Sequence, residues 1–117
     1  MRFAVLIPAL LTASVASAQS FDFVPAPHQG LNRIYRVHKL TGEMGACQFG
    51  LKEGGIGVTL CYPAGEGAKA MAPGDYGLVA SQHTAEAGIF RINRQTGDMS
   101  VCYVQNDEQV VCTAPAK

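Results

Sequence analysis

The sequence predicts an all-β protein of two tandem four-stranded antiparallel units, packed as a small sandwich or barrel, with one hairpin disulfide in each unit. Three observations lead to this fold class. The chain repeats itself after 55 residues, which indicates an internal duplication. Apolar and polar side chains alternate in both copies, as in half-buried strands. The four cysteines fall as one pair in each copy.

Residues 1–18 have the three parts of a secretion signal. Arg2 precedes an apolar stretch that ends in the small residues 16–18, so cleavage is expected after Ala18. The apolar run is shorter than the roughly 20 residues needed to span a bilayer. We therefore expect an exported protein, periplasmic or secreted. Its mature part, 19–117, has a length that suits one domain, and we expect no membrane span in it.

The charge balance argues against two classes of partner. The chain has 9 Lys+Arg and 9 Asp+Glu, and loss of the signal removes only Arg2 from this balance. A nucleic-acid-binding protein needs an excess of Lys and Arg on one face to neutralise phosphates. A polybasic membrane-surface protein needs the same excess. We therefore expect neither nucleic acid nor a membrane surface as a partner.

The two copies of the repeat are residues 21–62 and 76–113. The match is strongest where Ile34–Cys47 aligns with Ile89–Cys102, because Ile, Arg, Thr, Gly, Met and Cys recur there identically. The segment between the copies, 63–75, is rich in Gly, Ala and Pro. Such a composition is typical of a loop, and we expect a mobile connection.

Each copy is expected to contain four strands. The first covers 21–26 or 76–81, and in the second, Tyr35 and Val37 alternate with polar residues. A turn is expected next, at Thr41-Gly42 and at the equivalent Thr96-Gly97, because Gly adopts the positive φ that a tight hairpin requires. A two-residue loop and a three-residue loop with a Gly bulge both fit, and they differ by one residue in register.

The third and fourth strands form a hairpin that contains both cysteines of the copy. If Cys47 faces Cys61, the turn falls on residues 53–55, which are Glu-Gly-Gly. If Cys102 faces Cys112, it falls on residues 106–108, which are Asn-Asp-Glu. Both are turn-forming sequences. Of the three connectivities that four cysteines allow, the repeat therefore selects the one with both disulfides inside hairpins. Each disulfide should stabilise the fold by roughly 3 kcal/mol.

The second copy carries the pattern Arg-Ile-x-x-x-Thr-Gly-Asp-Met-x-x-Cys, followed about ten residues later by a second Cys. This resembles short exported bacterial proteins of uncharacterised function, whose β-hairpins carry an Arg…Thr-Gly…Cys…Cys pattern. The likeness is clearest over 89–113. Those proteins often have Trp before the last cysteine, where this chain has Val111. The resemblance implies export and a hairpin fold, and it implies no activity.

No group of residues predicts catalysis, a cofactor or a metal site. Met and Cys are soft-metal ligands, but the Met-x-x-Cys spacing places them on opposite faces of a strand. Cysteines that pair in disulfides are not free nucleophiles. His28 and His83 occupy equivalent positions in expected loops, so we interpret them as surface residues. The residues considered were Met44, Cys47, Met99, Cys102, His28, His38 and His83.

Arg36 and Arg91 are the candidate interaction residues. They occupy equivalent positions on the face opposite the aromatic residues, and Arg is favoured at recognition surfaces. The alternative is that each covers its own sheet and pairs with a local acid, Glu43 or Asp98.

We therefore expect a non-enzymatic interaction or structural module of the cell envelope. Its partner would be another envelope protein or a second copy, bound through sheet surface or an unpaired edge strand. The alternative hypothesis is a periplasmic small-ligand or metal-binding protein that uses the space between the units. A small hydrolase or redox enzyme is the third.

Overall fold

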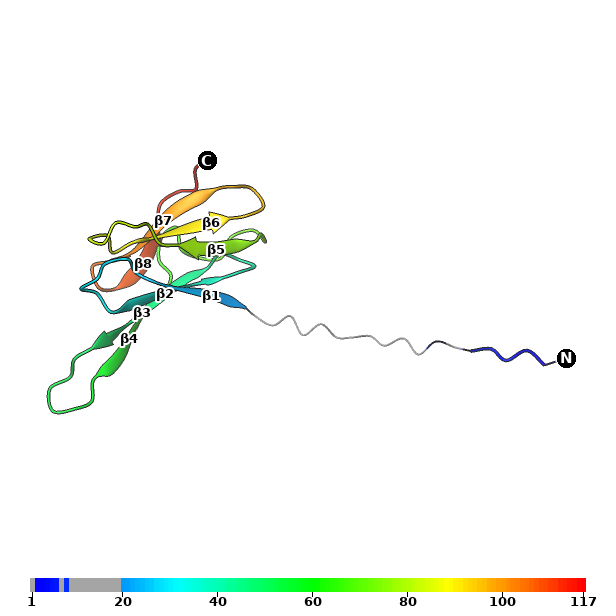
Figure 1. Cartoon of the computed structure of the whole chain (residues 1–117), viewed down its shortest axis with the longest axis horizontal. Coiled ribbons are helices and arrows are strands. Elements are labelled where there is room, and N and C mark those ends of the chain that lie inside the picture. Colours follow the sequence, from blue (N-terminus) through cyan, green and yellow to red (C-terminus); the bar gives the residue numbers. More distant parts are fainter. Residues whose placement is uncertain (1, 7, 9–19) are drawn as a thin grey trace.

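Figure 1 shows the computed structural model of the chain, which describes residues 2–6, 8 and 20–117. The expected signal cleavage site after Ala18 lies outside the described residues. The described residues form eight strands and no helix. The strands are β1 (Phe21–Pro25), β2 (Arg33–His38), β3 (Met44–Gly50), β4 (Val58–Tyr62), β5 (Tyr76–Val79), β6 (Ile89–Asn93), β7 (Met99–Gln105) and β8 (Gln109–Cys112).

The strands form two separate antiparallel sheets, one from each copy of the repeat. Their orders are β1-β2-β3-β4 and β5-β6-β7-β8. The register also repeats: Val37 faces Met44 in the first sheet, and Ile92 faces Met99 in the second. The predicted all-β fold of two four-stranded antiparallel units is confirmed. We call residues 21–62 the first unit and residues 76–113 the second unit.

Both predicted disulfides are present, and each joins facing residues of a hairpin. Cys47 is bonded to Cys61, and Cys102 is bonded to Cys112. The second hairpin turns where the sequence predicted, with positive φ angles of 54° and 52° at Asn106 and Asp107. Asn and Asp tolerate this conformation better than most residues, which explains why that turn needs no glycine.

The Thr-Gly loops have neither of the two lengths considered from the sequence. The backbone N–H of His38 donates to the carbonyl of Glu43 at 2.9 Å, so four residues, 39–42, lie in the loop. Gly42 supplies the positive φ, at 74°, and Gly97 does the same at 79°. The threonine hydroxyl before each glycine accepts the N–H two residues later, at 3.3 Å and 3.2 Å. This use of the threonine explains why the Thr-Gly pair recurs.

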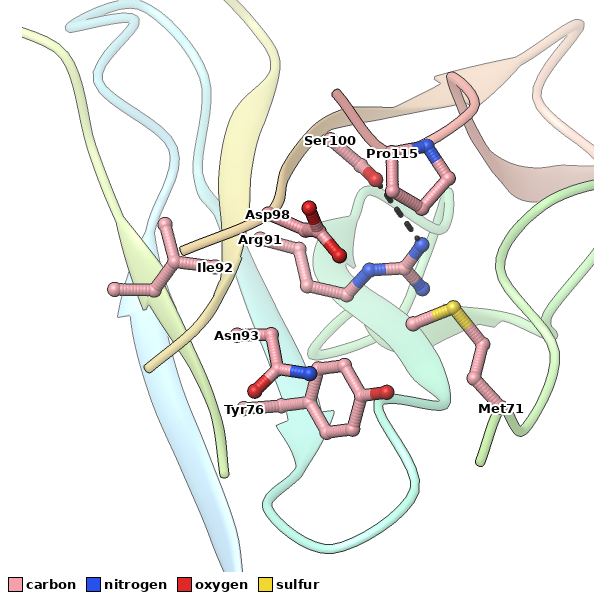
Figure 2. A pocket seen from close by; sticks show the side chains of 8 residues that line it. All are labelled: Met71, Tyr76, Arg91, Ile92, Asn93, Asp98, Ser100 and Pro115. Atoms are coloured by element: carbon pink, nitrogen blue, oxygen red, sulfur yellow. Dashed lines mark hydrogen bonds between the residues drawn. The ribbon is translucent and has the colours of Figure 1, made fainter. Parts of the chain in front are cut away.

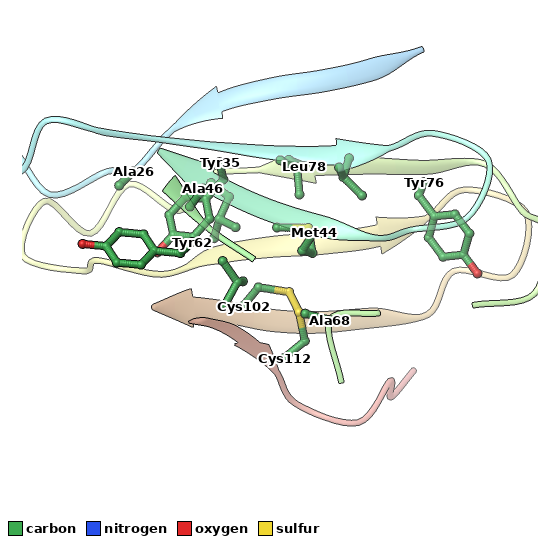
Figure 3. Close-up of a cluster of buried hydrophobic side chains, with 13 residues drawn as sticks. Ala26, Tyr35, Met44, Ala46, Tyr62, Ala68, Tyr76, Leu78, Cys102 and Cys112 are labelled. Atoms are coloured by element: carbon green, nitrogen blue, oxygen red, sulfur yellow. A yellow bond between two sulfur atoms is a disulfide. The ribbon is translucent and has the colours of Figure 1, made fainter. Parts of the chain in front are cut away.

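The two sheets pack face to face as a sandwich, and the core lies between them (Figure 3). We call the face of each sheet that meets the other sheet its inner face, and the opposite one its outer face. Tyr35 is fully buried, and its hydroxyl donates to the carbonyl of Ala87 in the second unit at 2.7 Å. The core residues are Ala26, Tyr35, Val37, Met44, Ala46, Tyr62, Ala68, Tyr76, Leu78, Ile89, Cys102, Val110 and Cys112.

The two units use opposite faces for this contact. In β2 of the first unit, Tyr35 and Val37 are buried while Arg36 is exposed. In β6 of the second unit, the buried residues are Ile89 and Arg91, which are equivalent to Ile34 and Arg36. The inner face of the first unit is therefore equivalent to the outer face of the second unit. Likewise, the outer face of the first unit is equivalent to the inner face of the second unit.

The connection 63–75 is tied to both sheets, which corrects the expectation of a mobile segment. The N–H of Gly65 donates to the carbonyl of Val110, and the N–H of Cys112 donates to the carbonyl of Glu66. Ala68 is fully buried, and its carbonyl accepts from the N–H of Met44 at 2.8 Å. The segment thus runs along the edge of β8 and then crosses to the first unit, where its small residues fit against backbone.

The bond between Tyr35 and Ala87 yields a prediction about how the sheets are joined. Replacing Tyr35 with phenylalanine should lower the free energy of unfolding by about 1 kcal/mol, because a partly buried carbonyl loses its donor. A shift of the melting temperature of about 4–8 °C would report this loss. Tyr103→Phe is the matched control, since Tyr103 is 40% exposed. Equal melting temperatures for the two variants would contradict the prediction.

Candidate functional site

Arg36 and Arg91 occupy equivalent positions but lie in opposite environments. Arg36 is exposed on the outer face of the first unit. Arg91 is only 2% exposed, because the second unit turns the equivalent face inward. Arg91 is therefore not available to a partner, and the expectation that it forms an interaction surface with Arg36 is wrong. The reason is the orientation of the second sheet, not the character of the residue.

Arg91 acts as a bridge inside the fold. Its Nη1 donates to the carbonyl of Gly42 and its Nη2 donates to that of Gly67, both at 2.9 Å. Figure 2 shows the guanidinium directed at Ser100, whose Oγ accepts from Nη2 at 3.4 Å. Burial lowers the pKa of the Arg91 guanidinium from its ordinary value, and a coulombic interaction with Tyr76 acts in the opposite direction.

Neither arginine pairs with the local acid that was considered. Among the described residues the salt bridge is Arg94 with Asp75, at 3.6 Å on the surface. Arg36 instead lies over the ring of Phe21, with 5.4 Å from its Cζ to the ring centroid. It also crosses the backbone at Gly45, where a Cβ would come within 2.8 Å of its Nε. The arginine thus lies flat on the outer face of the first unit.

Large apolar side chains share this outer face with Arg36. Phe23 is 61% exposed, Ile34 is 42% exposed and Phe49 is 51% exposed. They share the face because Phe23 is the Cα partner of Arg36 and Ile34 is the Cα partner of Cys47. An open hollow of about 230 Å³ lies on the same face, lined by Asn32, Ile34, Cys47, Gln48, Phe49 and Thr59. We call this face, with its hollow, the first-unit outer face.

Comparison with protein-family models, curated proteins and solved structures finds no match. Across the part of the chain that the structure describes, no helix has the length and apolar character needed to cross a membrane. The two disulfides are compatible with an exported protein.

The two disulfides differ in their surroundings. Cys102 is fully buried and Cys112 is 9% exposed, since both lie on the inner face of the second unit. Cys61 is exposed and Cys47 is half-buried, on the first-unit outer face. All four sulfurs are bonded, with no free cysteine among the described residues. No cysteine thiol is therefore available as a nucleophile in this state.

The residues considered for a metal site have structural contacts instead. Met44 is 2% exposed on the inner face of the first unit, while Cys47 lies on the outer face. His38 Nδ1 accepts the N–H groups of Leu40 and Thr41, both at 3.2 Å. His28 Nδ1 accepts the N–H of Gly30 at 3.0 Å. Within 2–6, 8 and 20–117, no group of three His, Cys, Asp or Glu side chains is placed to hold a metal ion.

The space between the units is filled by side chains. A cavity of about 30 Å³ lies beside Arg91, lined by Met71, Tyr76, Ile92, Asn93, Asp98, Ser100 and Pro115 (Figure 2). One water molecule needs roughly 10–15 Å³ measured in this way, whereas small-molecule sites occupy about 300–1,000 Å³. This cavity has room for water and not for an organic ligand.

Proposed function

We propose that this chain is an exported, non-enzymatic interaction module of the cell envelope that binds a protein through its first-unit outer face. One observation carries the proposal. Three large apolar side chains and one arginine are exposed on the same face of a sheet that is braced by a disulfide on that face. A contiguous apolar patch of this kind is typical of an interaction site.

The composition of the face favours a folded protein surface as the partner. Aromatic residues and Arg are enriched where proteins bind one another, and charged residues other than Arg are depleted there. Phe23, Ile34 and Phe49 would pack against an apolar surface. Arg36 would donate to a carbonyl or carboxylate at its edge, because the guanidinium has five N–H groups and no acceptor. The short strands of a sheet keep these side chains in fixed positions, which reduces the entropy lost on binding.

The alternative, a small-ligand or metal-binding protein that uses the space between the units, has less support. The cavity beside Arg91 is about 30 Å³, and the inner faces otherwise meet in a packed core. The hollow on the first-unit outer face is larger, at about 230 Å³. Its lining is mostly apolar and belongs to the face already assigned to a protein partner.

Site-specific crosslinking in the cells that export the protein would test this function. A photoreactive amino acid at position 23 should give covalent adducts with protein, because Phe23 lies on the proposed binding face. The same group at position 108 is the matched control, since Glu108 is exposed in the β7–β8 turn of the second unit and not on that face. Arg36→Glu should reduce the yield from position 23. Equal adducts from both positions, or none from position 23, would reject the proposal.

A further inference from the structure

We infer that this protein associates head to tail with a second copy of itself, an inference that rests on the proposed function and names its partner. The first-unit outer face of one copy would pack on the outer face of the second unit of the next. This contact would repeat, between chains, the contact that the two sheets already make within the chain.

The first step is that the first-unit outer face is equivalent to a surface that is buried within the chain. Ile34, at 42% exposure, is equivalent to Ile89, which is fully buried. Phe23, at 61%, is equivalent to Leu78, at 5%. Thus the same positions that form half of the internal contact in the second unit are open in the first.

The second step is that the outer face of the second unit is equivalent to the other half of that contact. Met99 is 49% exposed, and its equivalent Met44 is 2% exposed in the core. Val79 and Tyr103 are 48% and 40% exposed on the same face. Terminal units in a stack of repeats normally carry a polar outer face. Here both terminal faces keep exposed apolar side chains, so a further unit can stack on each.

The third step uses the internal contact as a template. Tyr35 reaches across to Ala87, to whose carbonyl its hydroxyl donates. In the repeat, Tyr35 is equivalent to Phe90, and Ala87 is equivalent to Asn32. Asn32 lines the hollow of about 230 Å³ on the first-unit outer face. The hollow is therefore placed where the template puts an aromatic ring of the neighbouring unit, and Phe90 of the next copy would occupy it.

Arg36 has a corresponding acceptor in the template. Arg91 donates to the carbonyl of Gly42. The equivalent residues in the other unit are Arg36 for Arg91 and Gly97 for Gly42. The loop at Gly97 has nearly the same conformation as that at Gly42, with φ angles of 79° and 74°. Arg36 of one copy would therefore donate to Gly97 of the next.

The contact between chains should be weaker than the internal one. Phe90 lacks the hydroxyl of Tyr35, and Gly77 lacks the carboxylate of Asp22, which accepts the N–H of Leu78 at 3.1 Å. Four strands about 4.8 Å apart and about 20 Å long give a face of roughly 400 Å². Twice this area, roughly 800 Å², is below the about 1,200–2,000 Å² of stable specific interfaces and in the range of weak, transient ones. We expect a dissociation constant on the order of micromolar or weaker, without a closed dimer, because a head-to-tail contact leaves one free face at each end.

Two variants on opposite faces test the arrangement. Ile34→Asp blocks the first-unit outer face, and Met99→Asp blocks the outer face of the second unit; both side chains are already exposed. Sedimentation should show that the mass of the unaltered mature protein rises with concentration while each variant stays monomeric. A mixture of the two variants should form a one-to-one dimer and nothing larger, since each supplies the face that the other lacks. Ile56→Asp, at a residue 99% exposed in the β3–β4 loop, is the control and should associate normally.

Several outcomes would overturn the proposed self-association. An unaltered protein that stays monomeric at about millimolar concentration would overturn the inference, and so would a mixture that does not dimerise. If either variant fails to fold, a photoreactive group at position 34 of the otherwise unaltered protein serves instead. It should crosslink to residues 79–103 of another copy, and crosslinks elsewhere would overturn the inference. In the cellular experiment from position 23, adducts with a different protein alone would reject self-association and keep the proposed function, whereas no adducts would reject both.

Discussion

Replacing Arg91 with alanine should destabilise the fold by about 2–4 kcal/mol, whereas Arg36→Ala should change its stability by less than about 0.5 kcal/mol. Arg91→Ala removes the donor from two carbonyls that belong to different parts of the chain, the loop at Gly42 and the connection at Gly67. Arg36 makes its contacts on an exposed face. Urea unfolding at concentrations well below micromolar, where the chains are separate, would measure both, and the Arg91→Ala melting temperature should fall by about 10 °C or more.

The equivalent positions make Arg36→Ala a close control for this comparison. Arg91→Met gives a second control, because methionine fills much of the same volume and donates no hydrogen bond. We expect Arg91→Met to destabilise the fold by less than Arg91→Ala does. Both variants lose the hydrogen bonds of the guanidinium, but both also remove the cost of desolvating a buried charge, and methionine leaves less empty space. Equal stabilities for Arg91→Ala and Arg36→Ala would show that the buried arginine does not hold the two units together.

The strand pattern of this chain could be predicted because it depends on local rules. The alternation around Tyr35 and Val37, the repeat and the spacing of the cysteines each constrain the same register, and the disulfide pairs Cys47–Cys61 and Cys102–Cys112 confirm it. The length of the Thr-Gly loops was not predictable in the same way. It depends on which backbone groups the threonine hydroxyl and His38 accept, and a one-residue difference leaves the local composition unchanged.

The face that each sheet turns inward was not encoded locally. In β2 the residues Ile34 and Tyr35 are both apolar but point to opposite sides, so the alternation alone does not say which side is core. The other sheet decides it: the first unit buries Tyr35, and the second buries Ile89, the equivalent of Ile34. The repeat suggested like environments for Arg36 and Arg91, and that was the error. Phe21 and Phe23 on either side of Asp22 were the available signal that the opposite face of the first unit is apolar as well.

Removal of the buried disulfide should cost more than removal of the exposed one, although both close loops of similar length. The sequence separations are 10 for Cys102–Cys112 and 14 for Cys47–Cys61, so the chain-entropy contribution is about 3 kcal/mol for each. The alanine pair at 102 and 112 also leaves space in the packed core, which adds roughly 1 kcal/mol or more. Urea unfolding should therefore show a loss of about 4–5 kcal/mol for this pair, against about 3 kcal/mol for the alanine pair at 47 and 61.

Graded reduction of the native protein, followed by alkylation and peptide mapping, gives an independent readout of the same difference. Cys47 and Cys61 should be labelled first, because a reductant reaches the exposed Cys61 directly, while Cys102 is covered by the first unit. Labelling of Cys102 and Cys112 should follow only as the molecule unfolds, and should speed up in Arg91→Ala. If the two disulfides were reduced together in the folded state, or if the two alanine pairs were equally stable, the second unit would not be turned inward. The packing of non-equivalent faces of the two units would then be wrong, and so would the head-to-tail contact that repeats it between chains.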